Sequence, residues 1–327
     1  MTFPLTLFSV PRPFQNYMGV IQTNAIQSWV QLSPACEIIL FGDDEGTEET
    51  ARSFGIRHFP KIERNEFGTP LLNSLFEKAQ QIASHKLMCY VNADIILMND
   101  FLKAIQRIRK WSFVLRNRLF LMVGRRWNLD VQNPIDFEED SWEETLRNRV
   151  TIEGQLYEHW GIDYFVFHRG LWKDIPPFLI GRTLYDNWLI YRARQLRVPV
   201  IDATHVVKAV HQNHDYGSKN LKKNDNTWNY DNLEIKKNLE LGGGISHAFN
   251  LRDATWILGN NILIPALTTS HLLRRRETLP VLYPNKLFLT IFLDSILSAI
   301  IFLIKWLPRL NPYRVFKSLL RRIRVIS

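Results

Sequence analysis

Asn92-Ala93-Asp94 is the polar cluster of this sequence that is best placed for chemistry. It follows residues 87–91, a short apolar run of the kind typical of a buried parallel strand. A carboxylate at the carboxyl end of such a strand lies where open α/β sheets bind their ligands. An ordinary turn stabilised by the Asp94 side chain would produce the same pattern. Residues elsewhere in the chain must therefore decide between a ligand site and a turn.

Two more polar groups follow predicted strands. Ser9-Val10-Pro11-Arg12 closes a strand predicted over residues 5–10, and Gly42-Asp43-Asp44 closes a strand predicted over residues 36–41. The carboxyl ends of parallel strands meet at the same edge of a sheet. We therefore expect all three polar groups on one edge.

Helical and strand patterns alternate along the chain, as a parallel sheet requires. Apolar residues recur at spacings of three and four over residues 14–32, which predicts an amphipathic helix. Thr69-Pro70 predicts the start of another helix, with Thr69 as N-cap. A late strand is predicted over residues 198–201, followed by a polar loop over residues 204–214. The alternation predicts an α/β fold with a doubly wound, mostly parallel sheet flanked by helices.

Composition sets broad limits on the class of protein. With 327 residues, of which 46% are hydrophobic, the chain is long enough for one large domain or two small ones. Cys36 and Cys89 are its two cysteines, and each lies in a predicted buried strand. A disulfide framework is therefore not expected, and a reducing compartment is favoured.

The net charge of +9 is concentrated at the C-terminal end. Seven basic residues and no acidic residue lie from Lys305 onward. This argues against a nucleic-acid-binding body and indicates that one end of the chain meets an anionic surface. Residues 1–10 lack the charged start and long apolar core of a secretory signal, so neither a signal nor an N-terminal anchor is expected there.

The order and spacing of these motifs over about residues 4–215 resemble the GT-A fold of nucleotide-sugar glycosyltransferases, nearest to the family 2 type. The resemblance implies that Ser9, Pro11 and Arg12 hold the nucleoside, with Asp43 or Asp44 binding the base or the ribose. It also places an Asp-X-Asp motif where this chain has Asn92-Ala93-Asp94.

The resemblance further implies a metal-assisted donor site. A nucleotide diphosphate needs Mg²⁺ or Mn²⁺ to neutralise charge on the leaving phosphate. Asp94 is the implied ligand, Asn92 and Ala93 are donor contacts, and His211 or His214 completes the metal site. Asn92 departs from the family pattern because it brings no charge. An imidazole ligand favours Mn²⁺ over Mg²⁺, although either histidine is equally consistent with a surface or core residue.

Two carboxylates are candidates for the general base that an inverting transfer requires. Asp186 opens a predicted helix, where the family places its acidic base, although Asp is also a common N-cap. Asp163 is the second candidate, either as a base or as an acceptor-binding residue. Arg125 and Arg126 are expected to reach the diphosphate, and plain surface charges are the alternative.

The sequence divides into a catalytic domain over residues 1–260, a connecting segment over residues 261–285 and a membrane-associating tail over residues 286–327. Residues 287–307 are apolar and long enough to span a bilayer. However, Asp294 would lie in the middle of the span, at a cost of about 2.5–3.5 kcal/mol. We expect a helix lying in the interface of an anionic membrane, followed by a basic amphipathic segment over residues 314–326. Spanning the membrane and packing on protein are the alternatives.

These features together predict a glycosyltransferase that moves a sugar from a nucleotide diphosphate, with UDP-sugars favoured, to a saccharide or lipid-linked acceptor. A cytoplasmic enzyme on the inner face of the cell membrane, peripheral or monotopic and working in polysaccharide biosynthesis, fits the tail. A protein that binds nucleotide-sugar without turnover and a membrane-bound scaffold are the alternatives.

Overall fold

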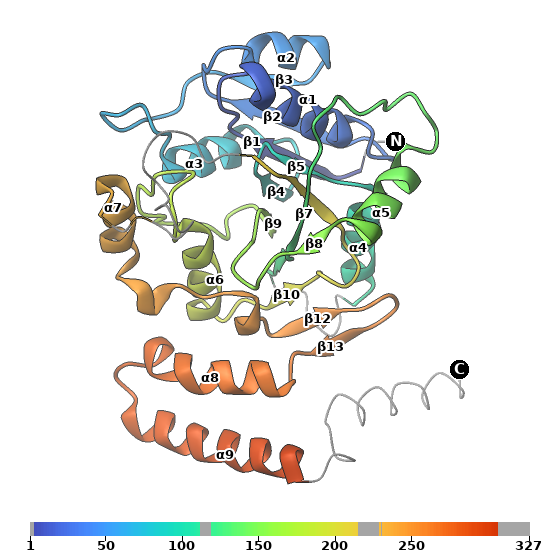
Figure 1. Ribbon diagram of the computed structural model, residues 1–327. Coiled ribbons are helices and arrows are strands. Elements are labelled where there is room, and N and C mark those ends of the chain that lie inside the picture. The colour runs from blue at the N-terminus through green and yellow to red at the C-terminus, as the bar shows by residue number, and fades with distance from the viewer. Residues whose placement is uncertain (1–2, 112–118, 215–228, 230, 307–327) are drawn as a thin grey trace.

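The computed structural model of the chain describes residues 3–111, 119–214, 229 and 231–306 (Figure 1). The basic segment predicted over residues 314–326 lies outside the described residues.

A large mixed sheet forms the centre of the molecule and positions the site. Within the described residues it has nine strands, and only β9 and β13 run against their neighbours. The predicted α/β architecture with a mostly parallel sheet flanked by helices is therefore confirmed. In spatial order the strands are β13 (Leu263–Pro265), β12 (Trp256–Leu258), β10 (Val200–Asp202), β6 (Leu121–Val123), β9 (Tyr164–His168), β4 (Leu87–Val91), β1 (Leu5–Ser9), β2 (Glu37–Phe41) and β3 (Arg57–Phe59).

Side chains of the central strands alternate between two hydrophobic cores, one on each face of the sheet. Leu7 and Cys89 point into the first core, whereas Phe8 and Tyr90 point into the second. This alternation explains why β1 and β4 are apolar throughout, since both faces of a covered sheet are buried. The first core is covered by α1 (Asn16–Val30) and α4 (Asn99–Lys110), and the second by α3 (Leu72–Ile82) and α6 (Tyr185–Gln195). The short helix α2 (Thr47–Ser53) connects β2 to β3.

A second, smaller sheet lies beside the first and was not predicted. Its order is β5 (Ile95–Ile96), β11 (Ala209–Gln212), β7 (Arg126–Leu129) and β8 (Gln155–Leu156), and α5 (Trp142–Ile152) lies between β7 and β8 in the chain. The expectation of a loop throughout residues 204–214 was therefore wrong for β11. Its apolar half is buried by pairing with β5 and β7, which lie far away in the sequence.

The expected helix start at Thr69 was also wrong. The helix α3 begins at Leu72 with Leu71 as its N-cap residue. The Thr69 side chain instead donates a hydrogen bond to Glu234, a residue of α7 (Leu233–Gly242). The local sequence suggests that the Thr69 hydroxyl caps a helix, but the buried Glu234 carboxylate accepts its hydrogen bond instead.

The C-terminal part of the described chain extends the molecule beyond one edge of the sheet. After α7 come the short 3₁₀ helices η1 (Ile245–His247) and η2 (Leu251–Asp253), then the antiparallel pair β12 and β13. The division at residue 260 stays a prediction, and that residue lies in the turn between these two paired strands.

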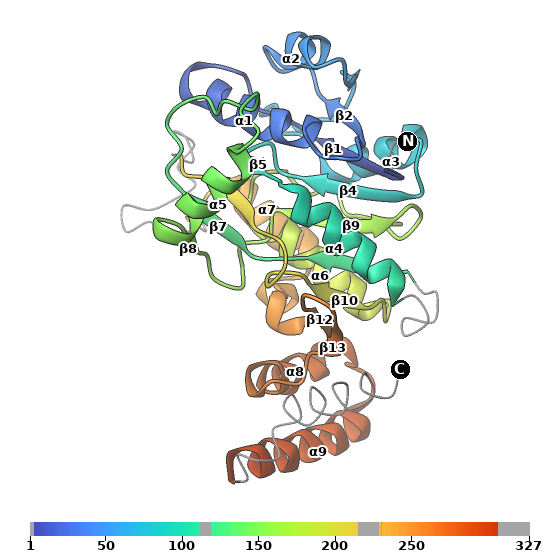
Figure 2. The same ribbon diagram turned by 90° about the vertical axis from the view of Figure 1, so that its right-hand side faces the viewer.

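Two helices, α8 (Thr269–Leu282) and α9 (Leu287–Trp306), lie side by side at this end of the molecule, with α9 outermost (Figures 1 and 2). Thr290, Asp294 and Ser298 follow one another at helical spacing on α9, and Asp294 is turned towards α8, where it pairs with Arg276. Among the described residues, no helix meets the length and hydropathy needed to cross a membrane.

Candidate active site and metal centre

The ends of β1 and β4 are tied together at the carboxyl edge of the sheet. The hydroxyl of Ser9 is buried and donates a hydrogen bond to the Val91 carbonyl at 2.6 Å. The side-chain amide of Gln22 accepts a hydrogen bond from the Arg12 backbone nitrogen and donates one to the Arg12 carbonyl. The Arg12 side chain approaches the loop before α6, because a Cβ built on Gly181 would lie 3.4 Å from Arg12 Nη2. The Ser9–Arg12 segment therefore joins the start of α6 to this edge.

The end of β2 presents two carboxylates that an arginine holds in place. Gly42 makes the turn with a φ of +94°, a conformation that glycine adopts readily. Arg64 Nη2 lies 2.6 Å from Asp44 Oδ2 and 3.1 Å from Asp43 Oδ1. Asp44 is largely covered, whereas the Asp43 side chain is 73% exposed. Asp43 is thus the more accessible of the two predicted nucleoside contacts.

Asp94, His211 and His214 converge into one cluster, which we call the metal cluster. Their candidate ligand atoms all lie within 4.8 Å of one another. Asp94 Oδ2 is 3.0 Å from His214 Nε2 and 3.4 Å from His211 Nε2. The second sheet produces this convergence, because β5 directly follows Asp94 and pairs with the strand that carries His211.

Two observations show that the metal cluster fits a divalent cation. Asp94 Oδ1 is buried and has no hydrogen-bond partner among the described residues. Burial alone would raise the pKa of Asp94, but His211 and His214 lower it well below its ordinary value, so the carboxylate is ionised. Two imidazoles and one carboxylate suit Mn²⁺ better than Mg²⁺, which prefers oxygen ligands. The cluster agrees with the predicted Mn²⁺ or Mg²⁺ site.

Asn92 connects the end of β4 to a buried ion pair. Its Nδ2 donates to Asp163 Oδ1 at 2.7 Å, and its Oδ1 accepts from the Tyr185 hydroxyl at 3.3 Å. Asp163 Oδ2 also lies 3.2 Å from Nη1 of Arg126, and both of these side chains are about nine-tenths buried. The guanidinium of Arg126 stacks on the ring of Tyr157 at 4.5 Å. Both ends of the Asn92 amide are therefore engaged by protein.

Asp186 lies in the first turn of α6, next to this network. Burial raises its pKa to about 7, and repulsion from Asp163 adds to the rise. A carboxyl group with this pKa is suited to accept a proton near neutral pH. The preceding Leu184 has a φ of +91°, an uncommon conformation for a side chain of this size that is often found at functional sites.

Arg125 and Arg126 are turned to different partners. Arg125 Nε donates to the Tyr157 carbonyl at 2.6 Å, and its backbone nitrogen donates to Thr204 Oγ1. Arg126, by contrast, reaches the Asp163 carboxylate. Both arginines were expected at the diphosphate. The sequence did not indicate the Arg126–Asp163 pair, because that contact joins residues 37 positions apart in the chain.

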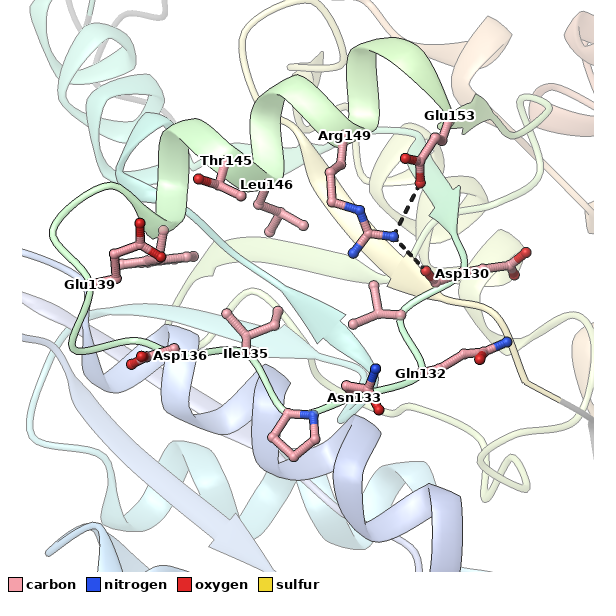
Figure 3. A pocket seen from close by; sticks show the side chains of 13 residues that line it. Asp130, Gln132, Asn133, Ile135, Asp136, Glu139, Thr145, Leu146, Arg149 and Glu153 are labelled. Carbon is pink, nitrogen blue, oxygen red and sulfur yellow. Dashed lines mark hydrogen bonds and ion pairs between the residues drawn. The ribbon is translucent and has the colours of Figure 1, made fainter.

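Two hollows are lined by the chain that follows β7, and one of them reaches the metal cluster at His214. One, of about 670 Å³, is lined by His214, Asn213, Tyr17, Asp130 and Gln132. The other, of about 570 Å³, shares Asp130 and Gln132 with it and lies against α5. Figure 3 shows the second hollow, where Arg149 donates to the Asp130 carbonyl and pairs with Glu153. Asp94 and Asp186 line neither of them.

Comparisons with known proteins give a limited result. No protein-family model matches the chain, and no curated protein matches it. Among solved structures, the chain is similar to S. aureus TarS 1–349 in complex with UDP-GlcNAc, at 14% identity and a TM-score of 0.41 over 65% of this chain and 60% of that one.

Two further solved structures resemble the chain to a similar extent. Glucosyl-3-phosphoglycerate synthase from Mycobacterium tuberculosis, with Mn²⁺, UDP-glucose and phosphoglyceric acid, is 13% identical at a TM-score of 0.41, over 73% of this chain and 80% of that one. The mannosyltransferase PcManGT from Pyrobaculum calidifontis, with GDP-Man and Mn²⁺, is 12% identical at a TM-score of 0.40, over 66% of this chain and 59% of that one. The chain thus spans 60% of the TarS structure and 59% of the mannosyltransferase. What the site does is inferred from its own residues.

Proposed function

We propose that the chain is a GT-A glycosyltransferase of the family 2 type. It transfers a sugar from a nucleotide diphosphate, with UDP-sugars favoured, to a saccharide or lipid-linked acceptor. The observation that carries this proposal is the convergence of Asp94, His211 and His214 at the carboxyl edge of a mostly parallel sheet. In the same region Asp186 has a pKa of about 7. A cation site and a carboxyl group that titrates near neutrality are the two features that this transfer needs.

The donor is assigned to the polar groups that follow β1, β2 and β4. Ser9 and Pro11 shape the first strand end, and Arg12 offers a positive charge for the diphosphate. Asp43 is the exposed carboxylate for ribose or base, with Asp44 held beside it by Arg64. Ala93, between Asn92 and Asp94, is assigned as a further contact of the donor. Arg125 is a weaker candidate for the diphosphate than Arg12, because its guanidinium is engaged by the Tyr157 carbonyl.

The metal cluster is assigned to the diphosphate. When bound there, Mn²⁺ or Mg²⁺ would neutralise the charge that develops on the leaving group. Asp94 contributes an ionised oxygen with no other partner among the described residues, which supports this role. Asn92 brings no charge in place of the first acid of the family motif, and the two imidazoles would add neutral ligand atoms to Asp94.

Asp186 is assigned as the general base that removes the proton of the acceptor hydroxyl. Its raised pKa supports this role. Asp163, the other candidate, is held by Asn92 and Arg126, so we assign it a positioning role. Its charge also favours the protonated form of Asp186, which keeps the pKa of the base near neutrality.

We further propose that the transfer takes place on the cytoplasmic, inner face of the cell membrane, in the assembly of a surface polysaccharide. The concentration of positive charge from Lys305 onward supports attachment to an anionic lipid surface. Two free cysteines, one buried and one partly buried, are consistent with a reducing compartment.

A panel of UDP- and GDP-sugars, incubated with the purified chain, Mn²⁺ and a panel of saccharide and lipid-linked acceptors, tests the proposed reaction. The expected result is release of the nucleotide diphosphate from one donor, which Asp186→Asn reduces and the surface variant Asp136→Asn leaves unchanged. Binding of a donor without any turnover would identify a nucleotide-sugar-binding protein and overturn the enzymatic proposal.

A further inference from the structure

The outward side of α9 is a continuous apolar surface. Its exposed positions repeat at helical spacing between residues 288 and 303, and Phe288 is 90% exposed and Phe292 62% exposed. Ser295 and Ala299 continue the same line, and none of the exposed positions described on α9 carries a charge. Contiguous apolar patches of this kind usually mark an interaction site. The large side chains of this outer stripe are Phe288, Ile291, Phe292, Ile296, Phe302 and Leu303.

The opposite side of α9 is already covered by protein. Thr290 and Ile301 are buried, and Asp294 Oδ1 accepts from Arg276 Nε at 2.6 Å. Hydrogen bonding to Arg276 lowers the pKa of Asp294, so this acid is ionised and paired. The acid that would oppose entry into lipid thus faces α8, and the outer stripe faces away from the molecule.

We propose that the outer stripe of α9 is a docking surface for an anionic lipid bilayer, on which α9 lies flat with α8 behind it. The assignment rests on the proposed membrane attachment and not on the reaction. The charge of the adjoining chain supports a lipid partner, since seven basic residues and no acidic residue lie from Lys305 onward. An apolar helix face next to a basic segment is the combination that binds anionic membrane surfaces.

The surroundings of α9 favour a flat helix over a spanning one. A spanning α9 would carry the Arg276–Asp294 pair into hydrocarbon or break it, and charged groups are costly there. A flat α9 leaves this pair and the neighbouring Arg274 and Arg275 on the water side of the helix.

Sedimentation with phosphatidylcholine vesicles, made with and without phosphatidylglycerol, tests the surface in the full chain. Wild type is expected to bind the anionic vesicles, more weakly as salt is added. The double variant Phe288→Ser, Phe292→Ser is expected to bind at least about tenfold more weakly, because it loses most of the aromatic area that would enter the lipid. Phe67→Ser is the matched control, because Phe67 is also an exposed phenylalanine at 56%. Thermal unfolding of each variant checks that it is folded.

The outcomes distinguish three claims: that the outer stripe is the docking surface, that the chain binds membranes, and that it transfers a sugar. If the stripe variant and wild type bind the vesicles equally, the outer stripe is not the docking surface, although the chain still binds the membrane. Absence of wild-type binding would overturn both, and donor hydrolysis in lipid-free solution would still report on the reaction. A lipid-free dimer that the stripe variant dissociates would assign the stripe to a second copy and overturn the proposal.

A labelling experiment distinguishes a flat helix from a spanning one. In intact cells expressing Ser327→Cys, a membrane-impermeant maleimide is expected to label the introduced thiol only after lysis. Labelling before lysis, absent in wild type, would show that the chain crosses the membrane and would overturn the flat arrangement.

Discussion

At the scale of single residues, the pKa values of two carboxyl groups of the site are shifted in opposite directions. Asp94 is ionised because two histidines surround its Oδ2, whereas burial and Asp163 hold the pKa of Asp186 at about 7. Environments that separate the pKa values of neighbouring acids are typical of sites that divide binding and proton transfer between them. The assignment of Asp94 to the metal and Asp186 to the proton follows this division.

The pKa of Asp186 sets the expected pH dependence of transfer. Only the ionised carboxylate accepts a proton, so the initial rate should rise as the pH passes through about 7 and then level off. Asp186→Asn should lower the rate by at least about 100-fold. Initial rates measured from pH 5.5 to 9, roughly centred on that pKa, test this. A rate that is flat across pH 7 would argue against Asp186 as the base.

The same residue should weaken the fold at high pH. Because the pKa of Asp186 is raised from 3.8 to about 7, its contribution to stability is fully present below pH 3.8 and is lost as the pH rises through about 7. This corresponds to at most about 4 kcal/mol. Asp186→Asn should therefore unfold at a higher denaturant concentration than wild type near pH 8, with the difference shrinking towards pH 4. A difference independent of pH would contradict the raised pKa.

Single-residue chemistry was only partly predictable from the sequence. Asp94, His211 and His214 could be named because the family resemblance implies a metal ligand at this strand end and a histidine well downstream, and the structure brings the three together. Arg126 and Tyr185, by contrast, take part through contacts across the sheet that no local pattern reveals. The hydrogen bonds at both ends of the Asn92 amide could not be predicted either, because its partners Asp163 and Tyr185 lie far away in the sequence.

At the scale of elements, a buried ion pair joins α7 to the loop that leads into α6. Glu234 of α7 pairs with Arg182 at 2.7 Å, and both side chains are more than nine-tenths buried. Asn65 and Thr69 also donate hydrogen bonds to Glu234 Oε1. This network holds the residues just before Asp186 against the loop preceding α3.

Removing the Glu234 carboxylate should lower the free energy of unfolding, and a second substitution at Arg182 should restore part of it. Glu234→Leu leaves the Arg182 charge buried without its carboxylate and should destabilise the chain by about 3–5 kcal/mol. Adding Arg182→Met should recover much of that loss, because an apolar pair replaces the buried ions. Denaturant unfolding of the single and double variants measures both steps. An equal loss in the double variant would show that the pair contributes through its hydrogen bonds and not through charge compensation.

The order of elements was predictable where apolar periodicity is strong, as in α1 and β4. The antiparallel direction of β9 was not, because an apolar strand buried on both faces reads the same in either direction. The second sheet was missed for a related reason. Its strands are two to four residues long and pair over long sequence separations.

At the scale of the whole molecule, the metal cluster and the α8–α9 pair belong to different parts of the structure. The metal cluster lies at the carboxyl edge of the central sheet, whereas α9 is the outermost helix beyond the strand pair β12 and β13 (Figure 1). This separation suits a protein whose catalytic part meets soluble donor while one end meets lipid.

Removal of the end of the chain should therefore separate attachment from nucleotide binding. Deletion of residues 285–327 is expected to abolish sedimentation with anionic vesicles and leave the affinity for UDP in the presence of Mn²⁺ unchanged. Vesicle sedimentation and calorimetry on the same preparation measure both. Loss of UDP binding in a deletion variant that still unfolds cooperatively would show that the two parts depend on each other.

The central claim is that Asp94, His211 and His214 hold a divalent cation that binds the nucleotide diphosphate. Calorimetric titration of UDP with Mn²⁺ into wild type and Asp94→Ala tests it most directly. Wild type should bind UDP in a Mn²⁺-dependent manner, and Asp94→Ala should bind at least about tenfold more weakly, since even the partners of metal ligands matter this much. Equal affinity in wild type and Asp94→Ala would contradict the account.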